Sequence, residues 1–141
     1  MDDILISDFK DNQLTGNIGL YYICYELSQL GWNALPTSRN AKGIDIVIYN
    51  RDATCKHTIQ VKTLRKRNPV PFGNKLSLIA DYLIICRVVG EKLPEVFVTK
   101  IDDDIKNRID PRPKSEKISY WLAPKNYEEF KDNWSIIGKG Y

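Results

Sequence analysis

The stretch GIDIVIYNRDATCKHTIQVKT, from Gly43 to Thr63, decides the fold. Side chains alternate between two faces from Gly43 to Tyr49 and again from His57 to Thr63, a period typical of half-buried strands. The segment Asn50 to Ala53 between them is a turn signal. The stretch therefore predicts two strands that pair as a hairpin.

Three polar side chains mark this hairpin as a candidate site. Asp45 lies on the first predicted strand, and Gln60 and Lys62 lie two residues apart on the second. In a suitable register all three share one face of the sheet. We expect their tips to cluster at a sheet edge that opens to solvent.

Composition restricts the class of protein. The chain has 141 residues, which suits a single domain spanning 1–141, and 43% of them are hydrophobic, which argues against disorder. We find no apolar run of membrane-spanning length and no signal peptide pattern. The three cysteines are widely spaced and His57 is the only histidine, which argues against a zinc site. We expect a cytoplasmic protein with reduced thiols and no membrane partner.

Positive charge is concentrated around the hairpin. Residues 39–75 hold nine Lys or Arg and two Asp, a net charge of +7. Such a field suits a polyanion such as nucleic acid, although charge runs also occur as plain solvated surface. The candidates for phosphate contacts form a basic belt with Lys62, and they are Arg39, Lys42, Arg65, Lys66, Arg67 and Lys75.

The remaining elements follow from periodicity and breaker residues. A mostly buried helix is expected from about Asn17 to Leu30, capped by Asn12 or Thr15, and residues 64–75 read as a loop. Tyr82 to Cys86 predicts a strand buried on both faces. Further predictions are strands at 32–35, 95–99 and 118–122, helices at 101–109 and 124–134, and a surface loop around Pro111 and Pro113. The fold class is α/β, with a mixed central sheet flanked by helices.

Asp45 followed by Gln60-x-Lys62 resembles the core motif of the PD-(D/E)XK nuclease superfamily. The resemblance covers Gly16 to about Arg67, and its order of elements looks like that of archaeal Holliday-junction resolvases. The D…QxK form resembles a variant in some methyl-directed restriction nucleases. The resemblance implies a restriction-endonuclease-like core.

The resemblance also implies a mechanism. Asp45, Gln60 and the backbone carbonyl of Val61 would hold Mg²⁺, with Mn²⁺ as an alternative metal, because hard cations take oxygen ligands. The metal would activate water for attack on a phosphodiester. Gln60 would orient the metal or the water, and Lys62 would assist the nucleophile.

Two positions depart from the family pattern. The family usually has an acid in the first half of its first helix, and the matching position here is Leu20. Glu26 lies later and about 240° around the helix, so it is a poor substitute and is expected to be solvated or hydrogen-bonded there. Gln60 brings an amide oxygen without charge. Asp45 is then the only clear anionic ligand, and metal affinity should fall accordingly.

The leading functional prediction is a Mg²⁺-dependent DNA endonuclease. One alternative is a non-catalytic nucleic-acid-binding protein with a degenerate nuclease fold. Another is an interaction subunit that docks through its aromatic C-terminal region. The sequence leaves the oligomeric state open, with a homodimer as one option.

Overall fold

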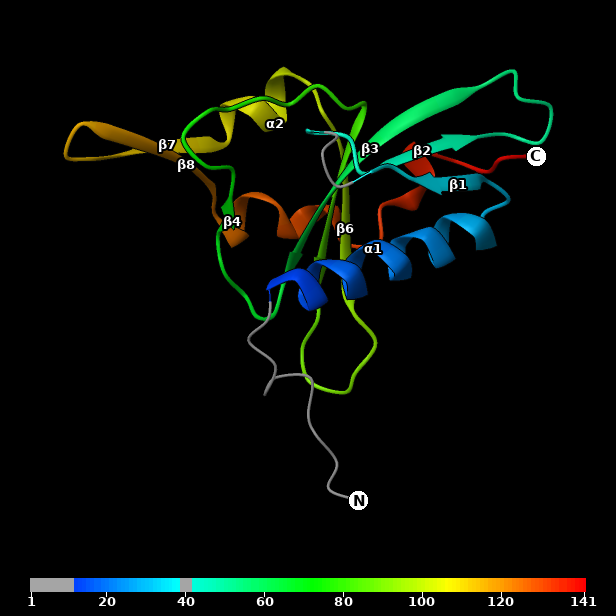
Figure 1. The fold of residues 1–141 in the computed structure, drawn as a ribbon, viewed down its shortest axis with the longest axis horizontal. Coiled ribbons are helices and arrows are strands. Elements are labelled where there is room, and N and C mark those ends of the chain that lie inside the picture. Colours follow the sequence, from blue (N-terminus) through cyan, green and yellow to red (C-terminus); the bar gives the residue numbers. More distant parts are fainter. Residues whose placement is uncertain (1–11, 39–41) are drawn as a thin grey trace.

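A computed structural model describes residues 12–38 and 42–141. Arg39 of the basic belt lies outside the described residues. The centre of the fold is a five-stranded sheet in the order β1-β2-β3-β5-β6 (Figure 1). Its strands are β1 (Asn33–Pro36), β2 (Ile46–Tyr49), β3 (Lys56–Leu64), β5 (Tyr82–Arg87) and β6 (Glu95–Lys100).

The central sheet is mixed, as the sequence predicts. Strands β1, β2 and β3 form an antiparallel meander, β3 pairs with β5 in parallel, and β5 pairs with β6 antiparallel. The hairpin of β2 and β3 is confirmed, with Ala53 in its turn at a φ of 55°. The fold is therefore α/β with a mixed sheet, as predicted.

Helix α1 (Asn12–Gln29) covers one face of the sheet. It begins earlier than the predicted Asn17, so Thr15 lies inside the helix and is buried, and its predicted capping role is wrong. Gly19 sits where the helix meets β3, and a Cβ there would overlap the Thr63 side chain. The close approach of α1 to β3 thus requires glycine at this position.

Two apolar clusters occupy the two faces of the sheet. The first lies under α1 and includes Ile23, Leu27 and Ile59. The second lies on the opposite face and includes Phe97 and Tyr127. Alternate residues of β5 enter each cluster, so every residue of this strand is buried, as predicted for Tyr82 to Cys86.

A second, three-stranded sheet has the order β4-β8-β7 and extends from the body (Figure 1). It comprises β4 (Val70–Pro71), β7 (Ile109–Lys114) and β8 (Lys117–Leu122). The prediction that residues 64–75 contain no element is therefore wrong, because Val70 and Pro71 pair with β8. The predicted loop around the two prolines is also wrong, because β7 is an edge strand, where proline is tolerated.

Short helical segments complete the fold. Helix α2 (Asp103–Asn107) is capped by Asp102, whose side chain accepts from the Ile105 N–H. The predicted C-terminal helix is wrong, because its place is taken by three 3-10 turns, η2 (Pro124–Asn126), η3 (Glu128–Phe130) and η4 (Trp134–Ile136). Tyr127 packs in the second cluster and Trp134 against the first. The side chains on one face of a regular helix cannot pack against both sides of the sheet. The chain instead turns at Asp132, where φ is 52°.

Candidate active site

Asp45 lies where β2 and β3 begin to pair. Its N–H donates to the Ile59 carbonyl at 2.8 Å, and its Oδ2 accepts from the Val61 N–H at 2.7 Å. The carboxylate thus occupies the place that a backbone carbonyl would take if the ladder continued. Gly43, at a φ of 76°, turns the chain away just before this point. The free edge of β3 is therefore exposed beyond Asp45.

The three predicted site residues share one face of the sheet. Ile46 pairs with Ile59, so the register places Asp45 opposite Gln60. Asp45, Gln60 and Lys62 alternate with residues that face α1, so they lie on the face away from the helix. Lys62 extends over Phe72, with its Nζ 5.1 Å from the ring centroid.

A cleft of about 910 Å³ opens at this edge. Asp45, Val61 and Lys62 form its floor, and the first half of α1, including Leu20, forms one wall. Gln60 does not line the cleft, and its Oε1 is buried with no hydrogen-bond partner. The other lining residues are Asn12, Thr15, Gly16, Asn17, Thr37, Ser38, Thr63, Leu64, Arg65, Lys66 and Pro71.

Burial perturbs both charged groups of the floor. Desolvation raises the pKa of Asp45, while the hydrogen bond from Val61 and the charge of Lys62 oppose the rise. Desolvation lowers the pKa of Lys62, and the charge of Asp45 opposes that change. The two groups are close enough to feel each other's charge, yet loss of water outweighs their attraction. Perturbation of this kind is typical of functional groups in clefts.

The oxygen donors of the floor suit a hard cation. Asp45 offers carboxylate oxygen, and Gln60 offers the buried Oε1 that lacks a partner. The N–H and C=O of one strand residue point to the same side, so the Val61 carbonyl also faces Asp45. Within residues 12–38 and 42–141, no three His, Cys, Asp or Glu gather to hold a metal. The donor types suit Mg²⁺, but Gln60 lies outside the cleft lining and the set supplies one negative charge.

The two departures from the nuclease pattern have a clear structural setting. Leu20, at the position where the family pattern has an acid, also lines the cleft. Glu26 does not line the cleft. Burial raises the pKa of Tyr22 to about 12, and a hydrogen bond with Glu26 adds to the rise.

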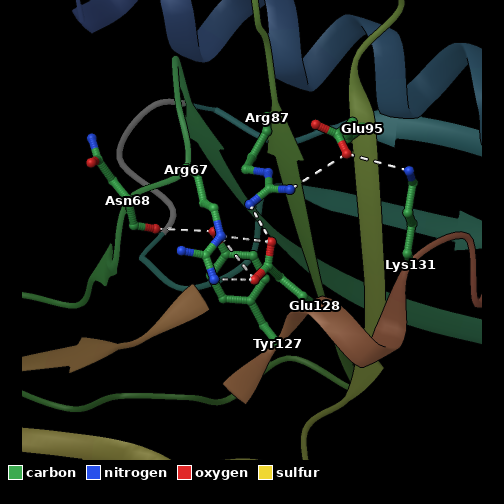
Figure 2. Close-up of polar contacts among 7 residues, drawn as sticks. All are labelled: Arg67, Asn68, Arg87, Glu95, Tyr127, Glu128 and Lys131. Atoms are coloured by element: carbon green, nitrogen blue, oxygen red, sulfur yellow. Dashed lines mark hydrogen bonds and ion pairs between the residues drawn. The ribbon is translucent and has the colours of Figure 1, made fainter. Parts of the chain in front are cut away.

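Only part of the basic belt belongs to the cleft. Lys62, Arg65 and Lys66 line it, and Arg65 Nε donates to Thr15 Oγ1 of α1 at 2.7 Å. Lys42 and Lys75 are exposed elsewhere on the surface. Arg67 is exposed but engaged by Glu128, with its Nη2 2.6 Å from Oε1 (Figure 2). Arg67 forms an intramolecular ion pair, and its contact with phosphate stays a prediction.

An ion-pair network that sequence reasoning missed anchors the segment after Lys66. Buried Arg87 contacts Glu128 at 2.9 Å and Glu95 at 3.4 Å (Figure 2). Tyr127 Oη donates to the Asn68 carbonyl at 3.0 Å. These partners are up to 61 residues apart in the sequence, so no local pattern signals them. The network fixes Arg67 and Asn68 against the sheet, next to the cleft.

Comparison with solved structures gives an informative likeness. No protein-family model and no curated protein matches the sequence. A solved structure does, that of the bacterial homing endonuclease I-Ssp6803I, with a TM-score of 0.62 and 17% sequence identity over 92% of each chain. The fold is therefore similar to that of a homing endonuclease. In the described part of the chain, no helix has the length and apolar character to cross a membrane.

Proposed function

We propose that the chain is a metal-dependent nuclease of the PD-(D/E)XK type that hydrolyses phosphodiester bonds in DNA. The observation that carries the proposal is the shared position of Asp45 and Lys62. They lie on one face of a diverging hairpin and on the floor of one cleft, and burial perturbs the pKa of both. The likeness of the fold to a homing endonuclease supports the same reading.

The residues at and beside the floor have distinct tasks in this proposal. Asp45, the Val61 carbonyl and the Oε1 of Gln60, which is buried outside the cleft lining, would hold Mg²⁺ or Mn²⁺. A bound ion would stabilise charge on the phosphate and acidify water. The Val61 N–H fixes the orientation of the Asp45 carboxylate. Lys62 has a lowered pKa, so it can exchange a proton with water or the leaving oxygen more readily than an ordinary lysine.

The cleft walls supply DNA binding. Arg65 and Lys66 line the cleft beside the floor, where they can contact phosphates on either side of the bond that is cut. Asp45 is the one carboxylate among the cleft-lining residues. The phosphate oxygens of bound DNA add negative charge to the site. We therefore expect weak metal binding by the free protein and stronger binding in the presence of DNA.

A non-catalytic DNA-binding protein is the second candidate. Leu20 and Gln60 favour it, because each stands where a second carboxylate would raise metal affinity. Both candidates predict DNA binding that weakens steeply with salt. They differ in metal-dependent cleavage.

The deciding experiment is a cleavage assay on plasmid and branched DNA with Mg²⁺ and then Mn²⁺. Wild type should cut, and Asp45→Ala and Lys62→Ala should abolish most of the activity. Glu26→Gln is the matched control, because Glu26 lies outside the cleft and should leave the rate unchanged. No cleavage by wild type or by Gln60→Glu, together with retained DNA binding, would establish the non-catalytic alternative.

A further inference from the structure

The ribbon of β7 and β8 projects from the fold on the side away from the tip of the β2–β3 hairpin (Figure 1). Six residue pairs join its two strands. Every residue of β7 after Ile109 is exposed, as are Lys117 and Ile118 at the start of β8. Most of this ribbon therefore does not pack into either apolar cluster of the described fold.

The two faces of the ribbon differ in chemistry. One face continues the apolar side of Ile109 and Leu122. The other carries Arg112, Lys114 and Lys117, with Asp110, Ser119 and Trp121 nearer the body. Contacts confirm this second face, since the Arg112 guanidinium lies 5.5 Å from the Trp121 ring centroid and Trp121 Nε1 donates to Ser119 Oγ at 2.8 Å. We call it the cationic face.

The free edge of β7 is protected against pairing with another strand. Pro111 and Pro113 have no N–H, and both lie on this edge strand. A partner cannot extend the sheet here, so recognition must use side chains. Long cationic side chains on an exposed ribbon are suited to a polyanion.

The ribbon is physically joined to the cleft. Strand β4 follows Lys66 in the chain and pairs with β8. The Phe72 N–H donates to the Tyr120 carbonyl at 2.9 Å. The Lys62 ammonium lies over the Phe72 ring. A ligand that extends from the cleft along this side of the molecule therefore reaches the ribbon.

We propose that the cationic face of β7 and β8 is a second contact surface for duplex DNA, seated in a groove of the same duplex whose backbone enters the cleft. The inference rests on the proposed function and deepens it by naming double-stranded DNA as the substrate. The major groove of B-DNA is about 12 Å wide and admits a two-stranded ribbon. Arg112, Lys114 and Lys117 contact the phosphates that border the groove. Asp110, near the body, and Glu116, in the turn, oppose part of this attraction.

The test measures binding of a fluorescent duplex of about 30 base pairs by anisotropy across a salt series. The ribbon variant combines Arg112→Gln, Lys114→Gln and Lys117→Gln. Each lost phosphate contact should reduce the slope of log K against log salt by about 0.9, so the slope should fall by up to about 2.7. At about 0.1 M salt the affinity should fall at least tenfold.

Two further variants separate a contact surface from net charge and from folding. A charge-matched control combines Arg51→Gln, Lys56→Gln and Lys92→Gln, all exposed and none on the ribbon. It should keep most of the wild-type affinity. The conservative set Arg112→Lys, Lys114→Arg and Lys117→Arg should bind as wild type does, which a loss of ribbon structure would not permit.

The outcomes distinguish a failure of the ribbon proposal from a failure of the proposed nuclease function. If wild type binds duplex DNA and the ribbon variant matches the charge control, the ribbon is not a contact surface and the nuclease proposal stands. If wild type binds single strands but not duplexes, the inference fails while the cleft keeps a nucleic-acid ligand. If wild type binds no DNA, both proposals fail together.

Discussion

Two clusters of charged residues lie on the same face of the central sheet, and they differ in how far the cost of burying charge is offset by partners. In the network around Arg87, the buried guanidinium meets two carboxylates and lies 4.6 Å from the Phe97 ring centroid. In the cleft, desolvation raises the pKa of Asp45 and lowers the pKa of Lys62, so the neutral form of each group is favoured. Gln60 Oε1 has no hydrogen-bond partner. The charge of Arg87 is compensated by two carboxylates, although its Nε has no hydrogen-bond partner, whereas the attraction between Asp45 and Lys62 does not offset their desolvation.

The difference is consistent with a structural role for the network and with the function proposed for the cleft. A compensated buried charge fixes the surrounding chain. Removing one partner leaves the other charge buried without compensation in a medium of low dielectric constant. An uncompensated group costs stability in the free protein and regains favourable interactions only with a ligand. We therefore expect substitutions in the network to affect folding, and those in the cleft to affect activity.

The largest effect should come from the cleft. Asp45→Asn should lower cleavage by about 10³-fold or more, because it removes the metal-binding charge while its amide oxygen still accepts from Val61. Lys62→Met should lower it by roughly 10²-fold to 10³-fold. Single-turnover cleavage rates and thermal unfolding of the same samples provide the measurement. A variant that lost activity through unfolding would contradict the assignment, since both should be as stable as wild type or more so.

The next effect is on stability. Glu128→Ala should lower the free energy of unfolding by about 2 kcal/mol, because Arg87 loses its closer carboxylate and retains Glu95. The control is Glu91→Ala, an exposed acid that should change stability by less than about 0.5 kcal/mol. Urea unfolding followed by fluorescence compares the two variants. Equal stability would mean that the network contributes nothing measurable.

A smaller effect should follow from adding charge to the cleft. Leu20→Glu adds a carboxylate to the lining of the cleft that holds Asp45, and we expect Mn²⁺ to bind about tenfold tighter without DNA, a gain of about 1.4 kcal/mol. Tyr21→Glu is the matched control, since Tyr21 is 62% exposed and does not line the cleft. Calorimetric titration with Mn²⁺ measures both. Equal affinities in the two variants would place Leu20 away from the metal.

The smallest effect concerns pH. Hydrogen bonds from Arg67 hold the pKa of Glu128 below its usual value, so its contribution to stability is complete above the unfolded pKa of about 4.3 and is lost as pH falls through the lower folded pKa. The pKa of Asp45 is raised, so its ionisation lowers stability as pH rises through the folded pKa, which lies above about 3.9.

Unfolding free energies from pH 7 to pH 3 should therefore separate the two clusters. The advantage of Asp45→Asn over wild type should vanish on acidification before the deficit of Glu128→Gln does, because the Asp45 transition lies at higher pH. The opposite order would mean that the Asp45 carboxylate is stabilised in the folded protein.

The sequence predicts those features that depend on neighbouring residues. Alternation from Gly43 to Thr63 identifies the hairpin and the shared face of Asp45, Gln60 and Lys62, because strand period alone decides which side chains point together. The unbroken apolar run at Tyr82 predicts a strand covered on both faces, which β5 is. Leu20 in the cleft wall also agrees with the position expected for it.

Features set by distant contacts escape local reasoning. The spacing of Tyr127, Phe130 and Trp134 suits a helix, but Tyr127 and Trp134 pack on opposite sides of the sheet, which overrides that preference. Prolines at 111 and 113 read as a loop because the sequence does not reveal that β7 is an edge strand. The partner of Arg67 is equally hidden, since Glu128 approaches only when the chain end folds over the second cluster.

The cleft residues and the residues that anchor the neighbouring segment lie far apart in the sequence, so they leave the ribosome at different times. Among the described residues, those that line the cleft lie between Asn12 and Pro71, whereas the side chains that fix Arg67 and Asn68 belong to Tyr127 and Glu128. A nascent chain therefore carries all of the cleft residues long before it carries their anchor. A chain still in synthesis therefore lacks the contacts that hold the segment after Lys66 against the sheet. Under the proposed nuclease function, this order would keep an unfinished chain from having its complete structure while it meets nucleic acid.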